Sequence, residues 1–445
     1  MKKYSVIILA AGLGSRLKSD IPKVFHRVGG LSLLDHLIQT AGNINSEEIV
    51  VVLNPKYGNI ELKFDASIKK AYQKVQKGTA DAVACGLNVL NNNESGWVYI
   101  LYGDTPLISP ETLLRLAEVA QKCENTAVAV LAMDSGDTQD LGKLEPAEEK
   151  ETIKNIIEAK DADDFDKVLP LCNSGLLIRK DILKRFLKEI KPSVSTGELY
   201  ITKMVKLAYE AGYVCRYYRG DKNELLGANT RFELALIEKK FQERERKKHL
   251  DNGVTLVAPE TVFFSHDTTI ESEVTVHPYV VFGENVHLKS GAQIGPFCVV
   301  EGAVVDNARV GPFARLRNGT KIENEAQIGN FVEIKNSQIS QGTKVNHLSY
   351  IGDTTIGKNT NIGAGTITCN YDGFKKHKTS IGENVFVGSN TALVAPVQIQ
   401  DNATIGAGSV VVKNVKNGEL GISRVAQKNI PHWSINFRKR KKCAE

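Results

Sequence analysis

Gly12, Gly14 and Arg16 lie in a loop near the start of the chain whose composition suits phosphate binding. The loop follows an apolar run over residues 4–11, which we interpret as a buried parallel strand. Bare backbone N–H groups in such a loop, together with the N-terminus of a following helix, attract anions. Arg16 adds a forked cation, and Lys23, which follows a proline, adds a point charge. The pattern predicts a site for a triphosphate substrate.

Two well-known phosphate-binding loops are excluded by the same residues. The dinucleotide fingerprint requires a third glycine where this chain has Leu17, and the P-loop requires a Gly-Lys-Ser/Thr sequence that this loop lacks. What remains is Gly-x-Gly-x-Arg followed by Pro-Lys, which places two cations beside the bound phosphates. A tight turn with two surface cations is the alternative interpretation.

Asp104 follows an apolar run at residues 97–101 that is predicted to be a central strand. In a doubly wound sheet, ligands bind in the crevice at the carboxyl ends of the strands. A carboxylate placed there, opposite the glycine-rich loop, is suited to hold magnesium. The more ordinary role of a single aspartate after a strand is to form a turn or cap a helix. Its placement makes Asp104 a candidate magnesium ligand.

A second group of polar residues lies within an otherwise repetitive region. They flank or precede apolar positions predicted to point inward, so their own side chains are predicted to point outward. The group consists of Arg315, Arg317, Glu333, Lys335, His347 and Tyr350. Residues 368–379 break the repeat and are predicted to form a loop. Asn370 and Tyr371 lie near the start of this loop. A histidine beside a carboxylate, cations and such a loop is the best candidate for a general base.

The repeat around this second group has a period of six residues. Apolar residues recur at that interval in three runs, often followed by glycine. The runs are Phe282, Leu288, Ile294 and Val300; Val304, Val310, Leu316, Ile322, Ile328 and Ile334; and Ile381, Val387, Leu393, Ile399, Ile405 and Val411. This recurrence is typical of a parallel β-helix, in which three hexapeptides complete one coil and the apolar residue points inward. A β-sandwich would need hairpin turn signals, which are missing.

The first half of the chain has the alternating strand and helix pattern of a doubly wound, Rossmann-like α/β sheet. Predicted strands lie at residues 4–11, 49–53, 98–102, 127–133 and 175–178. The charged segment 231–249 is predicted to be a connecting helix with apolar residues only in its first half. We therefore expect its first half to pack against the domain and its second half to be solvated. We predict an α/β domain at 1–229, a linker helix at 230–250 and a β-helix domain with a basic tail at 251–445.

Length and composition fit a protein with two domains. The chain has 445 residues, of which 42% are hydrophobic and 24% charged. The tail beyond Arg424 contains six cations and one carboxylate, and so accounts for five of the six net positive charges. The remainder is therefore not a polyanion-binding surface, and we predict no nucleic-acid or membrane partner. Seven cysteines without paired spacing, and an N-terminal apolar run too short for a secretory leader, indicate a cytoplasmic protein.

Taken together, these motifs resemble one enzyme family over essentially the whole chain. The segment from Leu9 to Arg16 with Lys23 is similar to the signature of sugar-phosphate nucleotidyltransferases, which many pyrophosphorylases share. Joined to hexapeptide repeats that contain the segment 363–373, it resembles the bifunctional bacterial enzymes that make UDP-N-acetylglucosamine. Those enzymes acetylate glucosamine 1-phosphate with acetyl-CoA, and then transfer a uridylyl group from UTP to N-acetylglucosamine 1-phosphate. The resemblance implies both activities here.

The resemblance implies a UDP-N-acetylglucosamine site in the first domain. The matching residues are Leu9, Ala10, Ala11 and Gly12 for backbone contacts, Arg16 and Lys23 for phosphates, Gln73, Gly78 and Thr79 for uracil, and Tyr102, Gly103, Asp104, Gly142, Glu158 and Asn173 for the sugar. Asn229 joins Asp104 as the second magnesium ligand. The family's glycine-threonine-glycine ends here in Ala80, a small residue that we discount as a departure. Arg16 and Lys23 are then catalytic, because they and magnesium lower the repulsion between two anionic reactants.

The resemblance also implies an acetyl-transfer site in the β-helix. It makes His347 the base that takes a proton from the amine of glucosamine 1-phosphate, with Glu333 as its orienter. The implied sugar-phosphate contacts are Arg317, Lys335, Tyr350 and Asn361, and the implied acetyl-CoA contacts are Ala364, Asn370, Tyr371, Ser389, Ala407 and Arg424. The basic tail around Trp433 would meet the phosphates or adenine of the coenzyme. A left-handed coil and a homotrimer with acetyl-transfer sites between subunits are implied by the resemblance, not by the six-residue count.

Two other interpretations stay open. Several pyrophosphorylases resemble this layout and use a β-helix only for assembly or regulation. The cluster around His347 and the loop after Asn370 argue against that interpretation, because a scaffold needs neither. The cationic run 438–442 is alternatively a nucleic-acid patch, but no aromatic residue is interleaved in that run.

Overall fold

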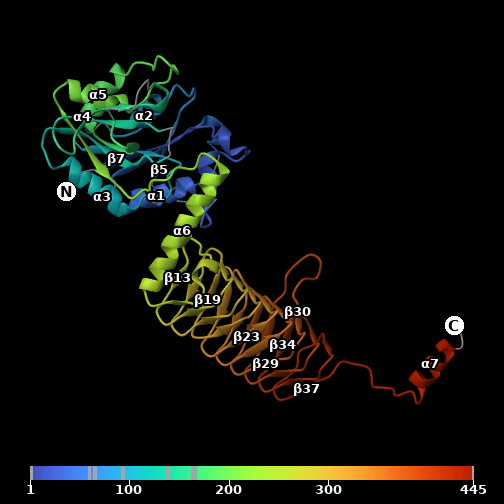
Figure 1. Ribbon diagram of the computed structural model, residues 1–445. Helices are drawn as coiled ribbons and strands as arrows, with labels where there is room; N and C mark the ends of the chain where they lie inside the picture. The colour runs from blue at the N-terminus through green and yellow to red at the C-terminus, as the bar shows by residue number, and fades with distance from the viewer. Residues whose placement is uncertain are drawn as a thin grey trace. The chain divides into compact units, whose positions relative to one another are not determined.

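The computed structural model describes residues 4–58, 62–63, 68–91, 96–136, 141–161 and 168–442. The chain forms two compact units, Met1–Arg244 and Glu245–Glu445. Figure 1 shows an α/β unit in the first half of the chain and a coil of short strands in the second. The boundary between the units lies within helix α6 (Arg231–Asp251), which occupies the segment expected to be a linker helix.

The first unit is built around a sheet of nine strands. Seven of them have the order β11-β7-β10-β6-β1-β4-β5, and β8 and β9 join beside β10. Their bounds are β1 (Tyr4–Ala10), β4 (Glu48–Leu53), β5 (Ile68–Tyr72), β6 (Trp97–Tyr102), β7 (Thr126–Asp134), β8 (Lys143–Pro146), β9 (Ile153–Ile157), β10 (Leu171–Arg179) and β11 (Val214–Arg219); a separate pair is β2 (Arg27–Val28) and β3 (Leu31–Ser32). β1 is parallel to β4 and β6, whereas β10 is antiparallel to β6 and β7. The predicted α/β sheet is confirmed, with an antiparallel strand that periodicity alone does not reveal.

Helices cover both faces of this sheet because its central strands are apolar on both sides. Helices α2 (Thr79–Leu87), α4 (Lys180–Phe186) and α5 (Lys203–Glu210) contribute to one buried cluster, and α1 (Leu33–Asn43) and α3 (Pro110–Ala120) to the other. Within β1, Ile7 belongs to the first cluster and Ile8 to the second. Because β1 and β6 are adjacent and parallel, the glycine-rich loop and the turn with Asp104 follow neighbouring strands at one edge of the sheet.

The second unit is a left-handed parallel β-helix with three parallel sheets (Figure 1). The first sheet contains β12 (Thr255–Leu256), β14 (Thr275–Val276), β17 (Gln293–Ile294), β20 (Arg309–Val310), β23 (Gln327–Asn330), β26 (Lys344–His347), β29 (Asn361–Ile362), β32 (Phe386–Val387), β35 (Thr404–Ile405) and β37 (Leu420–Gly421). The second contains β13 (Thr269–Ile270), β16 (His287–Leu288), β19 (Ala303–Val305), β22 (Thr320–Ile322), β25 (Gln338–Ile339), β28 (Thr354–Ile356), β31 (Thr379–Ile381) and β34 (Val397–Ile399). The third contains β15 (Val281–Phe282), β18 (Val299–Val300), β21 (Arg315–Arg317), β24 (Glu333–Lys335), β27 (Tyr350–Gly352), β30 (Ile367–Cys369), β33 (Ala392–Val394) and β36 (Val410–Val411).

The apolar residues of the six-residue count form the core of this coil. Ile328, Val345 and Ile362 pair in register on successive strands, and all three are almost fully buried. Stacking like side chains in this way removes them from water without any sheet-on-sheet packing. The predicted fold is confirmed.

One position of the count is wrong. Val305, not Val304, pairs with the inward residues Leu288 and Ile322, and Val305 is fully buried. The step from Leu288 to Val305 is 17 residues, so the chain is one residue short of three full hexapeptides here. Because strand side chains alternate between faces, a shift of one residue exchanges inside for outside.

A long insertion leaves the coil between β30 and β31. Thr368 belongs to β30 and is 1% exposed, and Thr379 begins β31, so the insertion covers residues 370–378 rather than the 368–379 expected. Thr368 replaces an apolar residue in the core because its Oγ1 accepts a hydrogen bond from Gly352 N at 2.7 Å. Figure 1 shows the insertion projecting from the side of the coil.

Helix α6 keeps a buried face over its whole length, so the expectation of a solvated second half is wrong. Ile237 and Phe241 are buried in the first unit, and Glu245 and His249 are buried in the second. The His249 ring packs on Phe264, with 4.7 Å between ring centroids. The buried face continues through polar residues spaced four apart, which a count of apolar residues alone misses.

His249 makes the stability of the second unit sensitive to acid. Neither ring nitrogen has a hydrogen-bond partner among the described residues, and burial, with Lys248 adding, lowers the pKa of the imidazole. In the unfolded chain, His249 takes up a proton at about pH 6.5, whereas in the folded chain it does so only at lower pH. The contribution of His249 to stability is therefore present above about pH 6.5 and is lost as the pH falls toward the folded pKa.

We expect His249→Phe to reduce the fall in melting temperature between about pH 7 and about pH 5. Thermal unfolding of the wild type and the variant over this range measures the effect. His287→Phe is the control, because His287 lies in the same unit but its side chain is 42% exposed. An unchanged pH dependence in His249→Phe would show that this residue does not titrate on unfolding.

The last described segment is helix α7 (Trp433–Lys442), in which Trp433 and Phe437 stack with centroids 5.0 Å apart. The residues of α7 up to Lys441 are exposed. Within the described ranges, no helix combines the length and the apolar character needed to cross a membrane.

Candidate active sites

A cavity of about 800 Å³ lies in the first unit beside the end of β6. It brings together eight of the residues predicted for the UDP-N-acetylglucosamine site: Arg16, Thr79, Tyr102, Asp104, Gly142, Glu158, Asn173 and Asn229. The other eight are not part of its lining: Leu9, Ala10, Ala11, Gly12, Lys23, Gln73, Gly78 and Gly103. Several of these lie directly behind it; Gly103 N, for example, donates to Leu9 O at 2.9 Å.

The glycine-rich loop packs against the short turn η2 (Lys23–Phe25). Gly14 has a φ of +63°, and a β-carbon there would lie 2.5 Å from the β-carbon of Lys23. Both the left-handed backbone and the close approach require glycine at this position. The loop therefore fixes Lys23 beside the turn η1 (Ser15–Leu17) that carries Arg16.

Lys23, Asp104 and Asn229 meet at one point. Lys23 Nζ donates to Asp104 Oδ2 and, at 2.7 Å, to Asn229 Oδ1. The Lys23 and Asp104 side chains are only 17% and 18% exposed. The two residues predicted to hold magnesium therefore direct their oxygens at a common cation, which in this structure is the lysine ammonium.

The first turn of α6 positions Asn229. Asn229 N and Thr230 N donate to Glu233 Oε2 at 2.7 and 2.8 Å, and Glu233 N donates to Thr230 Oγ1 at 3.2 Å. This is a capping box. Ala228 N donates to Asp104 O at 3.0 Å, which joins the cap to the turn after β6. The Thr-x-x-Glu spacing signals such a cap, but sequence reasoning did not use it.

Tyr102, Asn173 and Glu158, which are predicted to contact the sugar, line the cavity together. Asn173 Nδ2 donates to Tyr102 Oη at 2.8 Å, and Asn173 N donates to Gly142 O at 3.0 Å. Burial raises the pKa of both the Tyr102 hydroxyl and the Glu158 carboxyl. A half-buried carboxyl beside a hydroxyl and an amide is suited to hydrogen-bond the hydroxyl groups of a sugar.

Gln73 and the turn before α2, the predicted uracil contacts, are held together by hydrogen bonds beside the lining residue Thr79. Gln73 Nε2 donates to Gly78 O at 3.0 Å and to Asp81 Oδ2 at 2.9 Å, which leaves Oε1 to accept from an N–H such as that of uracil. Gly78 has a φ of +121°, and a β-carbon there would lie 2.5 Å from Leu199 N. Ala80 N donates to Leu199 O at 2.8 Å, a contact that is the same for alanine and glycine. The departure at Ala80 thus preserves the backbone geometry.

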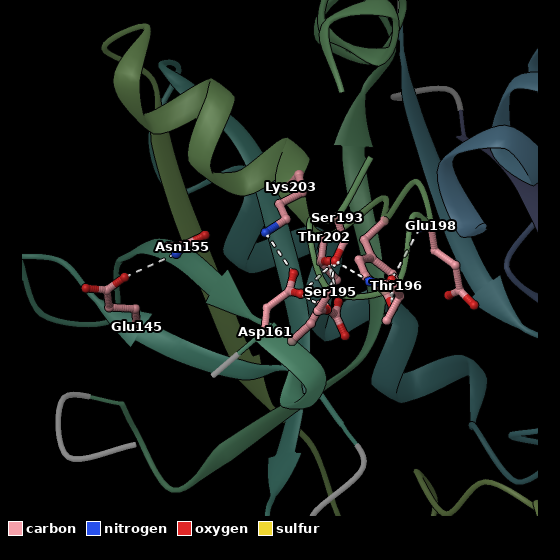
Figure 2. A network of polar contacts seen from close by, with 11 residues as sticks. Glu145, Asn155, Asp161, Ser193, Ser195, Thr196, Glu198, Thr202 and Lys203 are labelled. Atoms are coloured by element: carbon pink, nitrogen blue, oxygen red, sulfur yellow. Dashed lines mark hydrogen bonds and ion pairs between the residues drawn. The ribbon is translucent and has the colours of Figure 1, made fainter. Parts of the chain in front are cut away.

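Figure 2 shows a polar network around residues 193–203 that sequence reasoning missed. Ser193 Oγ donates to Asp161 Oδ1 at 2.6 Å, and Lys203 Nζ lies 3.4 Å from Asp161 Oδ2. The hydrogen bonds from Ser193 and Ser195 lower the pKa of Asp161, so this carboxylate stays ionised and holds the segment in place. Serine, threonine and glycine at 193–197 signal a turn, but they do not identify its partners.

The same segment connects two parts of the predicted UDP-N-acetylglucosamine site. Thr202 Oγ1 donates to Glu158 Oε1 at 2.5 Å, and Ile201 N donates to Thr79 Oγ1 at 2.9 Å. Thr79 belongs to the predicted uracil turn and Glu158 to the predicted sugar contacts. Adjacent residues of one segment therefore set the separation between the predicted uracil turn and the predicted sugar contacts.

His347 lies at a corner of the β-helix and is exposed. Its Nδ1 lies 2.9 Å from Asn330 Oδ1, which is an acceptor. Nδ1 therefore carries the hydrogen of the neutral ring, and Nε2 keeps the lone pair. The arrangement gives this candidate base a defined tautomer at the surface of the coil.

Glu333, expected to orient His347, is instead bonded to Arg317. Arg317 Nη1 donates to Glu333 Oε1 at 2.8 Å. Asn330 takes the expected place because the strand register pairs Asn330 with His347 and Glu333 with Tyr350. Asn330 could have been found from the 17-residue step between coils, which places it beside His347. A strict count of six gives a step of 18 residues and misses this pairing.

Three cations gather near the predicted sugar-phosphate contacts. Arg317 and Lys335 are register partners, and Lys376 from the 370–378 insertion lowers the pKa of Lys335, with Arg317 adding to the effect. A cluster in which Lys376 and Arg317 both disfavour the charge on Lys335 is suited to bind a phosphate dianion. Tyr350 lies on the same sheet, whereas Asn361 lies on the neighbouring one, so the fold does not place Asn361 on this face.

His347 shares a column with three of the predicted acetyl-CoA contacts. Each column member follows an inward residue by two positions, and those inward residues pair in register on successive strands. The column consists of His347, Ala364, Ser389 and Ala407, and Arg424 Nη1 joins it by donating to Ala407 O at 2.7 Å. With strands about 4.8 Å apart, the column spans about 14 Å. Its shape suits an extended ligand whose reactive end lies at His347.

The remaining predicted contacts, Asn370 and Tyr371, differ in their surroundings. Asn370 is 8% exposed, and its Nδ2 donates to Asp353 Oδ2 at 2.6 Å. Tyr371 is 61% exposed, and its hydroxyl donates to Gly373 O at 2.6 Å. Asn370 is therefore fixed to the coil, while Tyr371 belongs to the projecting part of the insertion.

Comparisons with known proteins match both units. The MobA-like NTP transferase domain model matches residues 6–174, and the bacterial transferase hexapeptide model of six repeats matches residues 378–413. The chain is 42% identical to the bifunctional protein GlmU of Zymomonas mobilis over 99% of each chain. It is 42% identical to that of Paramagnetospirillum magneticum, over 98% of this chain and 97% of the relative, and 41% identical to that of Wolbachia pipientis, over 96% and 98%. Because this similarity runs through both units at nearly full length, the chain belongs to the family of bifunctional GlmU proteins.

Proposed function

We propose that this GlmU chain carries one activity in each unit. The unit Glu245–Glu445 transfers an acetyl group from acetyl-CoA to the amine of glucosamine 1-phosphate. The unit Met1–Arg244 then transfers a uridylyl group from UTP to N-acetylglucosamine 1-phosphate, which releases pyrophosphate and gives UDP-N-acetylglucosamine. Two separate groups of site residues, one in each unit, support this division.

In the first unit, a phosphate oxygen of the sugar phosphate attacks the α-phosphorus of UTP. Both reactants are anions, so the residues must lower their repulsion and stabilise the charge on the departing pyrophosphate. Arg16 and Lys23 supply positive charge, while Glu158 and Asn173 hold the sugar. Among the described residues, the cavity lining contains neither histidine nor cysteine, which fits a direct displacement without a protein nucleophile.

Asp104 and Asn229 are suited to hold magnesium. Both offer oxygen, the ligand that Mg²⁺ prefers, and both already direct that oxygen at one cation. Two protein ligands suffice, because Mg²⁺ usually keeps waters and substrate phosphate oxygens as its other ligands. When bound, the ion would neutralise charge on the triphosphate. The Lys23 ammonium is close enough to this point to pair with a phosphate oxygen of the nucleotide.

In the second unit, His347 removes a proton from the amine of glucosamine 1-phosphate. Nε2 accepts the proton while the amine nitrogen bonds to the thioester carbon, and coenzyme A leaves as the carbon–sulfur bond breaks. Arg317, Lys335 and Lys376 hold the phosphate of the acceptor. The column from His347 to Ala407 holds the acetyl-CoA so that its thioester lies at the base.

The observation that carries the second activity is the His347–Asn330 pair at the head of that column. A β-helix used only for assembly needs no histidine with a fixed tautomer there. The test is an assay of the purified chain in two stages. We expect acetyl-CoA-dependent thiol release with glucosamine 1-phosphate, and then UTP-dependent pyrophosphate release from the product. Pyrophosphate release from N-acetylglucosamine 1-phosphate without any thiol release would instead favour the scaffold interpretation.

We also infer that the chain forms a homotrimer through its β-helix. Tyr279, Phe297, Phe313 and Phe331 stack along one corner with centroids 4.9 to 5.2 Å apart, and each is 46% to 55% exposed in the single chain. A continuous exposed aromatic stripe of this kind favours a protein partner, here other copies of the chain. The acetyl-transfer site would then lie between copies, which accommodates the position of Asn361 on a neighbouring sheet.

Sedimentation of the wild type is expected to give about three times the chain mass of 48.8 kDa. Phe313→Asp should lower that mass, because it places a charge in the middle of the aromatic stripe. Val299→Asp is the matched control, since Val299 is also exposed on the coil but lies outside the stripe. A wild type that stays monomeric would contradict the trimer, and a trimeric Phe313→Asp would exclude this stripe as the interface.

A further inference from the structure

Asp353 lies at a corner of the β-helix between two asparagine side chains. Its Oδ1 accepts from Asn336 Nδ2 and its Oδ2 accepts from Asn370 Nδ2, each at 2.6 Å. Asp353 and Asn370 are 9% and 8% exposed. Asn336 and Asp353 follow the register partners Lys335 and Gly352, so they occupy the same corner in successive coils. The three side chains form a stack that ends where the 370–378 insertion leaves the coil.

The backbone of Asp353 has little freedom. Its φ is +50°, a left-handed conformation that aspartate, asparagine and glycine tolerate best. Asp353 N donates to Lys335 O at 3.0 Å, and Asp353 O accepts from Thr379 N at 3.2 Å. Asn370 begins the insertion and Thr379 follows it, so Asp353 holds both ends: one through its side chain and the other through its backbone.

A carboxylate at this place fixes the orientation of a neighbouring amide. An ionised carboxylate only accepts hydrogen bonds, so Asn370 must present its NH₂ group to Asp353 and direct Oδ1 elsewhere. A neutral pair is less restrictive. Asn307 and Asn324, whose side chains are bonded at 2.6 Å in the same β-helix, keep their hydrogen bond if both amides flip together.

Asn370 also lies beside the predicted sugar-phosphate contacts. A β-carbon on Gly352 would lie 2.5 Å from Tyr350 Oη and 2.6 Å from Asn370 Nδ2. The hydroxyl and the amide therefore converge over the same backbone position, where only glycine leaves room for both.

We propose that Asp353 is a positioning residue for acetyl transfer and acts through Asn370. It fixes the Asn370 amide so that Oδ1 accepts a hydrogen bond from an N–H group of acetyl-CoA, and it holds the two ends of the insertion that carries Asn370, Tyr371 and Lys376. This inference rests on the acetyl-transfer activity proposed above. It adds a residue that has no contact with the reacting atoms but determines which atom of Asn370 faces the ligand.

The test uses Asp353→Asn, which keeps the shape of the side chain but is no longer an acceptor only. Its NH₂ group opposes one of the two flanking amides, so the orientation of Asn370 is no longer fixed. We expect the dissociation constant of acetyl-CoA, measured by calorimetry on the full chain, to rise about 10-fold, as for the loss of one hydrogen bond. The pH dependence of turnover should stay as in the wild type, because His347 is untouched.

Asn336→Ala is the matched control, since it removes the other amide from the same carboxylate and leaves the bond to Asn370. A purely structural stack predicts that Asn336→Ala weakens acetyl-CoA binding as much as Asp353→Asn does, and that result would overturn the proposal. A double-mutant cycle adds a second criterion. If Asp353 acts through Asn370, Asp353→Asn has no further effect on binding in an Asn370→Ala background, whereas an equal effect in both backgrounds overturns the proposal.

The outcomes separate this inference from the activity on which it rests. A wild type that binds no acetyl-CoA overturns both. A wild type that binds it, together with an Asp353→Asn variant of equal affinity, overturns only the role of Asp353. Should Asp353→Asn not fold, Asp353→Ser replaces it, because serine removes the acceptor-only carboxylate that fixes the Asn370 amide. Wild-type affinity in that variant would likewise overturn the proposal.

Discussion

His347→Ala is expected to lower the turnover of acetyl transfer by about 100- to 10,000-fold, the range that a positioned general base contributes. The amine of glucosamine 1-phosphate is largely protonated near neutrality, and an ammonium has no lone pair with which to attack a thioester. Without Nε2 the reaction depends on the small fraction of free amine. The residual rate should therefore rise with pH, while acetyl-CoA affinity and uridylyl transfer stay near wild type. Thiol release measured between about pH 6 and about pH 9 tests the effect.

His287→Ala is the matched control for this variant. His287 is on the same β-helix, and its Nε2 lies 3.2 Å from Glu271 Oε1. Its side chain is 42% exposed, and it is far along the chain from the candidate site. It should keep the wild-type rate and the wild-type pH dependence. If His347→Ala retained more than about a tenth of the acetyl-transfer rate, another group would have to be the base.

Asn330→Ala separates the base from its orientation. It removes the acceptor for Nδ1, so both tautomers of His347 become accessible and part of the population has its lone pair on the wrong nitrogen. We expect Asn330→Ala to lose less acetyl-transfer turnover than His347→Ala does, and its turnover should still depend on an ionising base. That result would agree with the contact between Asn330 and His347.

The second large effect is expected for Asp104→Asn, which should lower uridylyl transfer by about 100- to 1,000-fold and leave acetyl transfer unchanged. The substitution keeps the size of the side chain but removes the charge that faces Lys23 and, in the proposed complex, magnesium. Two anionic substrates would then meet in a site whose cations are no longer held in place. Pyrophosphate release and thiol release, measured on the same preparation, give the two rates.

Asp134→Asn is the matched control for Asp104→Asn. Asp134 is in the same unit and pairs with Arg219, but this pair is 45% and 63% exposed, where an ion pair contributes little. It should behave as wild type in both assays. Equal loss of both activities in a folded Asp104→Asn variant would contradict the assignment of the two reactions to separate sites.

The sequence determined the class of both units because each depends on a local, repeated signal. Continuous apolar runs ending in small residues indicated buried strands, and the six-residue recurrence of residues such as Ile328 and Ile334 indicated a coil. These signals survive because burying an apolar side chain constrains its residue type wherever the strand lies. The position of Val304 failed because the coils around it have 16 or 17 residues instead of 18, and a count of sequence positions does not detect where the residues are missing.

The sequence also indicated candidate chemistry in the glycine-rich loop, Asp104 and His347, because the residue types themselves carry it. Their partners were a different matter. Asn330 was passed over in favour of Glu333, and Lys376, Thr202 and Asp353 were not singled out at all. Each of these residues is an ordinary polar residue in sequence, and nothing in its immediate neighbours marks it.

Only the tertiary structure decided which polar groups meet. Lys23, Asp104 and Asn229 are far apart in the sequence. They converge because the three loops that carry them meet at one edge of a sheet. Asn330 meets His347, and Asp353 meets Asn370, because each pair is one coil apart, at a step of 17 residues. Burial constrains the type of each residue separately, so it can be recognised in the sequence. Hydrogen bonds and charge pairs depend instead on distances between residues, which are set by the strand register and the loop lengths. For that reason the fold could be predicted from periodicity, and the orientation of the catalytic groups could not.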